Sequence, residues 1–288
     1  ELEFINGVFN AAASSVRSAG LVVFPLEEAA KGEYAQVVNK HLGHSGKYMK
    51  DGINALNASF LVGAVFIGVN RSTEIEHPVY IYNITDGRAG NVFAQPRTLV
   101  HVAANAGVVM VETYGSIGVA DHFTNQVMEV VVEQDARVEY YKVQNDSNRS
   151  SLVSTTHFRQ VGKCYVHAVT ISLNGAMVRN NLNMVMEAEH CDSNMFGLYF
   201  TSGSCHVDNH TIVDNAKPHC LSNEYYKGIL DGSSTGVFNG KIFVQQDAQK
   251  INAFQSNKNI LLSDTANVYT KPQLEIFADD VKCSHGCT

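Results

Sequence analysis

The sequence has no tryptophan, only five prolines and only six cysteines among its 288 residues. Six cysteines are too few for a disulfide scaffold in a chain of this length. No two of them form the C-x-x-C pair that is typical of zinc ribbons and thioredoxin-like redox sites. The cysteine usage therefore favours a reducing compartment, and we expect a cytoplasmic protein.

An excess of basic charge and a long apolar run are also missing. The chain has 21 Lys and Arg against 28 Asp and Glu, a net charge of -7, and its basic residues are scattered. This pattern lacks the basic surface that binds nucleic acid. The longest apolar run, residues 60–69, is about half of the roughly 20 residues that a membrane-spanning helix needs. The chain also does not open on a charged and then apolar signal segment, so we expect neither a nucleic-acid nor a membrane partner.

Several enzyme motifs are absent as well. Residues 236–241 have the glycines and lysine of a phosphate-binding loop, but the run is one residue short and Ile242 stands where Ser or Thr would bind Mg²⁺. The serine between Gly115 and Gly118 does not have the spacing of a nucleophile elbow. We therefore expect that this chain does not itself hydrolyse ATP.

What the chain does have is 45% hydrophobic residues, enough for one long domain or two short ones. Residues 26–42 place apolar side chains at helical spacing despite Gly32, and residues 52–60 predict a second helix. Beyond residue 63, β-branched and aromatic residues alternate with polar ones. We expect an N-terminal mixed segment with short helices at residues 1–62 and an all-β core domain at residues 63–288.

A short unit recurs within the β-rich region: a turn residue, then a small residue, then a strand. It occurs at residues 105–108, 135–138, 247–251 and, more loosely, 264–268. Weak repetition of a coil-sized unit is typical of solenoids, in which Val130, Val132, Val138 and Tyr140 would point into a stacked core. A right-handed parallel β-helix fits this pattern, and an antiparallel sandwich fits it about as well.

The densest group of chemically active residues lies near the C-terminus. Residues two apart on a strand share a face, so Cys283, His285 and Cys287 would present a thiol, an imidazole and a second thiol together. Sulfur and imidazole ligands suit iron or zinc. The alternative is that Cys283 packs as a small hydrophobic residue and His285 makes an ordinary surface hydrogen bond.

A second group is formed by His206, Asp208 and His210, which would also share one strand face. Their side chains are suitable ligands for a divalent metal, so they are weaker metal candidates. The favoured alternative is an outward row of side chains that hydrogen-bond between neighbouring coils, because a metal-bound histidine usually needs a supporting partner.

Residues 270–286, which include the run from Lys271 to Ile276 and the Cys-Ser-His-Gly sequence, closely resemble the signature segment of the SufB/SufD family, in particular its SufD-type subunits. Further matching runs lie upstream, at residues 206–211, 222–231, 236–241 and 253–259. The likeness extends from about residue 100 onward and is looser before it.

This resemblance implies a right-handed parallel β-helix and a non-catalytic scaffold role in iron-sulfur cluster assembly. It implies pairing with a SufB-type subunit through the C-terminal strands, and association with a SufC-type ATPase. Cys283 and His285 would be functional at the subunit interface, where an iron-sulfur cluster is bound transiently. The interface strand would contain Lys271, Pro272, Gln273, Leu274, Glu275 and Ile276.

The resemblance also sets expectations for cofactors and assembly. Reduced flavin can accompany such complexes, whereas no cofactor is expected in the isolated chain. Alanine is usual in the family where this chain has Cys287, which is an extra thiol. Family members continue into a helical segment that docks SufC, so ATPase binding would need sequence beyond Thr288. The open edge would allow a homodimer when SufB is absent. The alternative function is a β-helix protein that binds or cleaves polysaccharide.

Overall fold

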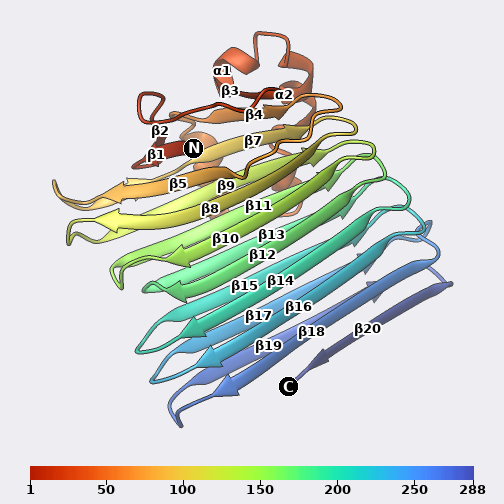
Figure 1. Ribbon diagram of the computed structural model, residues 1–288. Helices are drawn as coiled ribbons and strands as arrows, with labels where there is room; N and C mark the ends of the chain where they lie inside the picture. The colour runs from red at the N-terminus through yellow and green to blue at the C-terminus, as the bar shows by residue number, and fades with distance from the viewer.

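The computed structural model describes residues 1–288. The chain winds into a solenoid of about eight turns, with 57% of its residues in strands and 8% in helices. Its long strands belong to two sheets, and Figure 1 shows them stacked from the N-terminal end to the C-terminal end. The two sheets therefore form the walls of one flattened stack of coils.

In each sheet, most neighbouring strands come from successive coils of the chain. From one edge to the other, the first sheet contains β2 (Val8–Phe9), β1 (Leu2–Ile5), β5 (Val79–Asp86), β8 (Gly107–Ile117), β10 (Arg137–Asn145), β12 (Tyr165–Asn174), β14 (Asp192–Thr201), β16 (Leu221–Leu230), β18 (Ile251–Leu261) and β20 (Val281–Cys287). The second sheet contains β19 (Asn267–Ile276), β17 (Thr235–Val244), β15 (His206–Asn215), β13 (Met177–Met186), β11 (Ser150–Gln160), β9 (His122–Val132), β7 (Arg97–Val102), β4 (Val65–Val69) and β3 (Leu21–Pro25), with β6 (Val92–Ala94) beside β9.

The pairing between strands decides between the two folds that the sequence allowed. Val138 of β10 pairs in parallel with Val108 of β8 and with Val166 of β12. Apart from the β1–β2 and β3–β4 pairs, every pair in both sheets is parallel, and parallel strands require crossover connections rather than hairpins. The predicted parallel β-helix is confirmed, and the antiparallel sandwich is excluded.

Side chains alternate between the inside and the outside of the solenoid along each strand, and the inward ones form the core. Val130, Val132, Val138 and Tyr140 are all fully buried, as predicted, and belong to a core cluster of 37 residues that runs through the stack. Successive side chains of a strand point to opposite faces, so one apolar row per coil is enough to continue the core. The solenoid therefore grows by adding similar coils to the same apolar column.

The recurring turn unit marks a corner of the coil. Asn105 and Asp135 adopt left-handed backbone angles, with φ of 58° and 55°, a region that Asn and Asp enter more readily than most residues. Each is followed by a buried alanine, Ala106 or Ala136. A small residue is required there because the chain turns tightly against the coils above and below.

The helices lie near the N-terminus, and one prediction about them is wrong. Residues 26–42 form two short helices, α1 (Leu26–Ala29) and α2 (Ala35–His41), rather than one. Gly32 lies in the break, where glycine weakens a helix, and the amides of Lys31 and Gly32 both bond to the Glu28 carbonyl and close α1. A 3₁₀ turn, η1 (His44–Lys47), follows, and α3 (Gly52–Ser59) confirms the second predicted helix. No helix is long and apolar enough to cross a membrane.

Polar contacts attach this N-terminal segment to the outer face of the second sheet. The backbone amides of Gly43 and Ser45 donate to the Glu129 carboxylate over 2.9 and 2.8 Å. His44 Nδ1 lies 2.8 Å from His157 Nε2, and both rings are buried. The segment is therefore held by hydrogen bonds and charges as well as by apolar packing.

Strands from the N-terminal segment also extend the two sheets. β1 pairs in parallel with β5, and β3 pairs antiparallel with β4. The helices lie between β3 and β4 in the chain, so the segment both caps the stack and covers one of its faces. The division into residues 1–62 and 63–288 stays a prediction.

The buried histidine pair predicts how stability depends on pH. Burial lowers the pKa of His157 to about 3, whereas an unfolded histidine has a pKa of about 6.5. Between these values the unfolded chain binds a proton that the folded chain does not. The free energy of unfolding should therefore fall as the pH falls, by up to about 1.4 kcal/mol per pH unit.

In His157→Gln the free energy of unfolding should change less steeply with pH, because one proton fewer is taken up on unfolding. The slope should be shallower by up to about 1.4 kcal/mol per pH unit, as measured by chemical denaturation between about pH 7 and about pH 4. His190→Gln, at an exposed corner, is the matched control and should keep the slope. Equal slopes in wild type and His157→Gln would contradict this assignment.

The close stacking of coils predicts a large effect at Gly162. A Cβ atom there would lie 2.4 Å from the backbone nitrogen of Gln134 in the preceding coil and 2.5 Å from its Cα atom. Neither backbone atom can move without shifting the coil, so Gly162→Ala should lower the free energy of unfolding by about 2 kcal/mol or more. Gly115→Ala, where no atom lies within 4 Å of the added methyl group, should cost much less. Denaturant titration of both variants checks the difference.

Candidate functional site

Within residues 1–288, β19 and β20 are the outermost strands at the C-terminal end of the stack. β20 pairs only with β18, and β19 pairs only with β17, so each of these last strands has one unpaired edge. Figure 1 shows β19 and β20 in blue at the end of the stack away from the helices. Unpaired strand edges carry free backbone donors and acceptors, which favour the addition of another strand.

The three predicted C-terminal residues lie on one face of β20. Cys283, His285 and Cys287 are in register with Ala253, Gln255 and Asn257 of β18. These three β18 residues are all buried, so their row faces the inside of the coil. Cys283, His285 and Cys287 therefore continue the inward rows into the last coil. Neighbours in such a row along the strand lie about 6.6 Å apart.

These three residues are more exposed than the equivalent residues in earlier coils, because residues 1–288 contain no further coil beyond β20. Cys283 is half-buried, whereas His285 and Cys287 are exposed. The apolar side of the last coil also lacks a cover, since Leu274, Val281 and Cys283 pack on the core from one side only. The end of the stack thus combines an unfinished apolar core with a thiol, an imidazole and a second thiol.

The electrostatic setting of Cys283 favours the neutral thiol. Burial raises the pKa of Cys283, and a hydrogen bond from the Ala253 backbone opposes this only in part. A thiol ligates a metal as the thiolate. Metal or sulfide binding at Cys283 therefore has to release a proton and is favoured by higher pH.

The chain alone does not complete a metal site. No group of three or more His, Cys, Asp and Glu side chains is arranged so that it could hold a metal ion. Tetrahedral zinc and iron sites take four ligands. The role of Cys283 and His285 as ligands stays a prediction, and it would require further ligands from another chain.

The predicted interface strand lies beside this row. Residues 271–276 form the second half of β19, with Pro272 and Leu274 in register with the buried Gly240 and Ile242. Proline lacks the backbone N–H that an inner strand donates to its neighbour. It is therefore tolerated on an edge strand, where that donor is not needed. On the outer face Glu275 pairs with Lys241 over 2.5 Å. A partner that extends the stack would contact Pro272 and Leu274 first.

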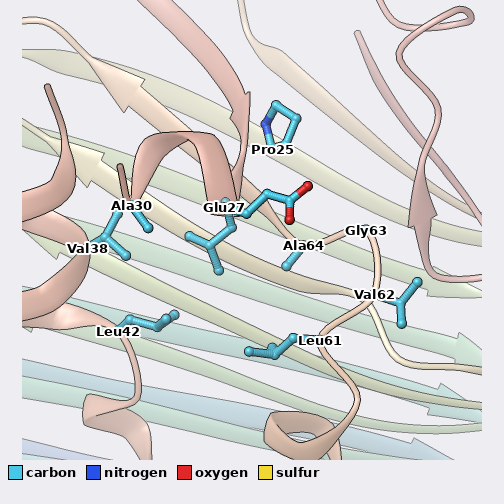
Figure 2. Close-up of a pocket in the computed structure, with 10 residues that line it drawn as sticks. Pro25, Glu27, Ala30, Val38, Leu42, Leu61, Val62, Gly63 and Ala64 are labelled. Carbon is cyan, nitrogen blue, oxygen red and sulfur yellow. The ribbon is translucent and has the colours of Figure 1, made fainter. Parts of the chain in front are cut away.

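Elsewhere on the chain, a hollow lies between α1, α2 and the loop before β4. Figure 2 shows it lined by Val38, Leu42 and Leu61, with Glu27 as its charged residue. Leu26 also lines it. Its volume is about 490 Å³. No set of polar groups converges on it, and no aromatic ring lines it. It therefore lacks the features of a catalytic or sugar-binding site.

Comparison with protein families identifies the chain. A family model described as "SUF system FeS cluster assembly, SufBD core domain" matches residues 83–288, and a second model, "SufBD protein N-terminal region", matches residues 2–81. The chain belongs to the SufBD family. The resemblance found in the sequence is confirmed.

Curated relatives agree with this assignment. An iron-sulfur cluster assembly SufBD family protein of Synechocystis is 32% identical over 241 residues, which are 81% of this chain and 53% of the relative. SufD of Escherichia coli is 30% identical over 235 residues, 81% of this chain and 56% of the relative. SufD of Bacillus subtilis is 24% identical over 298 residues, 95% of this chain and 62% of the relative. The matched part spans little more than half of the first two relatives.

The weaker metal candidates of this SufBD chain lie on the outer face of β15. His210 Nε2 is 2.9 Å from Asp208 Oδ1, and Arg179 of the neighbouring β13 donates to Asp208 Oδ2 over 2.8 Å. Burial opposes the ionisation of Asp208, but His210 and the Arg179 charge hold its pKa below the ordinary value. These contacts are those of the outward row between coils, and metal binding by His206, Asp208 and His210 stays a prediction.

Sequence reasoning missed polar groups inside the SufBD solenoid. Lys142 is buried two positions after Tyr140 and donates to Ser154 and Thr156, and burial lowers its pKa to about 8. Glu224 is also buried, accepts a 2.6 Å hydrogen bond from Gln255, and has its pKa raised to about 7 by burial. Lys142 continues the inward row of Val138 and Tyr140, but alternation alone does not distinguish a buried polar residue from an exposed one.

Three of the remaining cysteines form a buried row at one corner of the coils. The amides of Asp192 and Leu221 bond to the carbonyls of Cys164 and Cys191, which places Cys164, Cys191 and Cys220 directly over one another. Hydrogen bonding to the Cys164 thiol, with burial, raises the pKa of Cys191 to about 12. These thiols take the place that Ala106 and Ala136 occupy in earlier coils. They pack as small core residues.

Proposed function

We propose that this chain is a non-catalytic scaffold subunit of iron-sulfur cluster assembly, acting in the cytoplasm with a SufB-type subunit and a SufC-type ATPase. Membership of the SufBD family supports the role in cluster assembly. The observation that carries the proposal is the row of Cys283 and His285 at the open end of the solenoid. Ligands at this end face whatever subunit continues the stack.

In this proposal a SufB-type partner pairs with the free edges of β19 and β20. The strand formed by Lys271, Pro272, Gln273, Leu274, Glu275 and Ile276 provides backbone groups for pairing, and its inward side chains bury apolar surface. The partner supplies the ligands that Cys283 and His285 leave missing. An iron-sulfur cluster is then bound transiently at the interface, and this chain contributes thiolate and imidazole ligands to it.

The partner subunits have different tasks in this scheme. ATP hydrolysis belongs to the SufC-type subunit, and reduced flavin, where present, binds at the level of the complex. Cys287 lies on the same face as Cys283 and can add a second thiolate. Without a SufB-type subunit the same free edges can pair with a second copy of this chain.

The alternative of a polysaccharide-binding or polysaccharide-cleaving protein is not favoured. Family membership points to cluster assembly. A sugar site would need an exposed groove with aromatic rings and converging carboxylates, and the acidic residues near the open end, Asp279 and Asp280, are adjacent on the chain. Both lie in a bend before β20, where Asp280 pairs with Lys250, so they do not form a free pair of carboxylates.

The test is anaerobic co-purification of this chain with SufB-type and SufC-type subunits, followed by reconstitution with iron and sulfide. We expect a stable complex that retains acid-labile sulfide and iron, and much less of either in each subunit alone. A chain that neither co-purifies with these subunits nor changes their iron content would refute the proposal.

A further inference from the structure

The outer face of the first sheet has apolar side chains on four neighbouring strands, β12, β14, β16 and β18, which Figure 1 shows in sequence along the stack. Phe200 of β14 is 50% exposed and lies in register with Ile229 of β16, which lies in register with Ile260 of β18, 58% exposed. The solvent-accessible apolar side chains of this face are Leu173, Leu198, Phe200, Ile229, Ile260 and Leu262. They form a continuous apolar surface near the C-terminal ends of the strands.

The second sheet differs in the same coils. Its outer side chains are joined by ion pairs, such as Arg179 with Asp208 and Lys241 with Glu275. Apolar exposure is therefore not a general property of these coils, and it is concentrated on one of the two outer faces. On folded proteins, contiguous exposed apolar side chains commonly mark a surface that another chain covers.

Two exposed charged residues flank the middle of the apolar surface. Lys227 and Asp231 lie two positions before and two positions after Ile229. The Asp231 amide bonds to the Thr201 carbonyl, so the alternation of β16 continues to Asp231 and places all three side chains on the outer face. Lys227 Nζ lies 5.1 Å from the centre of the Tyr225 ring, and Asp231 accepts an adjacent backbone amide. The two charges are roughly 13 Å apart along the strand and do not neutralise each other.

This pattern of charges is complementary to itself. A two-fold axis along the stack, over the row of Phe200, Ile229 and Ile260, places each of these side chains against the same side chain of a second copy. The rotation also exchanges the two ends of every strand, so Lys227 of one copy faces Asp231 of the other. An axis parallel to the strands would place Lys227 against Lys227, which like charge opposes. Charge therefore selects the axis along the stack.

The face is large enough for a weak dimer. β14 and β16 each have ten residues. Four strands of this length, spaced by about 4.8 Å and rising about 3.3 Å per residue, cover roughly 600 Å². Two copies would bury about 1,200 Å² in total, which is the lower limit of stable specific interfaces. The strands of the two copies would be nearly aligned, as they are in β-sandwiches.

We propose that the outer face of the first sheet binds a second copy of this chain about a two-fold axis along the stack. Lys227 and Asp231 pair across the interface at two symmetric points, and Phe200, Ile229 and Ile260 form its apolar centre. The free edges of β19 and β20 lie outside this contact. The dimer therefore joins two chains and leaves the edge proposed for a SufB-type subunit free in each.

The test is sedimentation equilibrium of the isolated chain at about 50 mM salt, where charge pairs are screened less than at physiological salt. We expect a monomer–dimer equilibrium with a micromolar Kd. Lys227→Asp and Asp231→Lys should each raise the Kd about tenfold, because each places like charges opposite one another at two points. The double variant, Lys227→Asp with Asp231→Lys, restores opposite charges and should return the Kd to within about threefold of wild type.

Three further variants are measured beside these. Lys217→Asp makes the same charge reversal at an exposed corner before β16 and should change the Kd by less than about twofold. Phe200→Glu places a charge in the apolar centre and should raise the Kd at least roughly thirtyfold. Leu274→Glu alters the end of the stack and should leave this dimer intact.

Three results would overturn the proposal. One is a wild-type chain that stays monomeric at about 200 μM, which would point to a different protein as the occupant of the face. Another is a double charge variant that dimerises no more tightly than the single variants. The third is a dimer that is lost in Leu274→Glu and kept in Phe200→Glu, because that dimer would form through the strand edges.

Discussion

Replacing Cys283 with serine or His285 with alanine is expected to slow cluster assembly by at least roughly tenfold in the complex with SufB-type and SufC-type subunits. Each change removes one ligand from the row on β20, and a metal site that loses a ligand or its support commonly loses tenfold to a hundredfold in affinity or activity. The measurement is the rate of cluster formation under anaerobic conditions, followed by absorbance and by transfer to an acceptor protein.

The matched control for these variants is Ser284→Ala. Ser284 lies between the two candidate ligands and is in register with the exposed Phe254, so it points to the opposite face of β20. Its replacement should leave assembly unchanged. All three variants should keep the free energy of unfolding within about 1 kcal/mol, because their side chains lie at an uncovered end. Full assembly by both Cys283→Ser and His285→Ala would refute their role as ligands.

Replacing Leu274 with glutamate is expected to weaken binding of the SufB-type partner by roughly thirtyfold or more. Leu274 packs on the core from one side and is in register with the buried Ile242. A partner coil that covers it would bury an unpaired carboxylate in the variant, at a cost of about 2 kcal/mol or more. The dissociation constant of the two subunits, measured by analytical ultracentrifugation or fluorescence, reports this effect.

Gln273→Glu is the control for this interface prediction. It places the same charge one position away on the same strand, where the side chain points to the outer face. It should change the dissociation constant by less than about threefold, which is the scale of a surface charge effect. Similar losses in Leu274→Glu and Gln273→Glu would mean that net charge, and not coverage of the inward row, controls partner binding.

Much of the fold could be predicted from the sequence, because the coils repeat one physical rule. Alternation identified Val138 and Tyr140 as inward, and turn residues before Ala106 and Ala136 identified a corner. The parallel pairing could not be decided this way, because short strands with regular turns suit a sandwich equally well. The family resemblance supplied that step.

Other features were beyond the reach of sequence patterns. His190 and His219 adopt left-handed backbone angles, with φ of 59° and 62°, at the corner position that Asn105 and Asp135 occupy in earlier coils. The helix predicted across Gly32 divides in two because tertiary contacts and one glycine outweigh helical spacing. The contacts of Arg97 with Asn57 and Glu129 join segments that are distant in the chain.

The candidate site followed from the sequence only in part. Strand periodicity placed Cys283, His285 and Cys287 on one face, and the structure has them there. Their position at an uncovered end depends on the number of coils and on which strands come last, which no local pattern encodes. Their function as ligands stays a prediction.

We propose that His285 and Cys283 of this chain hold iron together with a partner subunit. The most direct measurement is the pulsed electron paramagnetic resonance spectrum of the reduced cluster in the reconstituted complex, with ¹⁵N-histidine incorporated only into this chain. We predict a ¹⁵N hyperfine coupling that disappears in His285→Ala. A cluster spectrum without ¹⁵N coupling, or a coupling that survives in His285→Ala, would contradict the account.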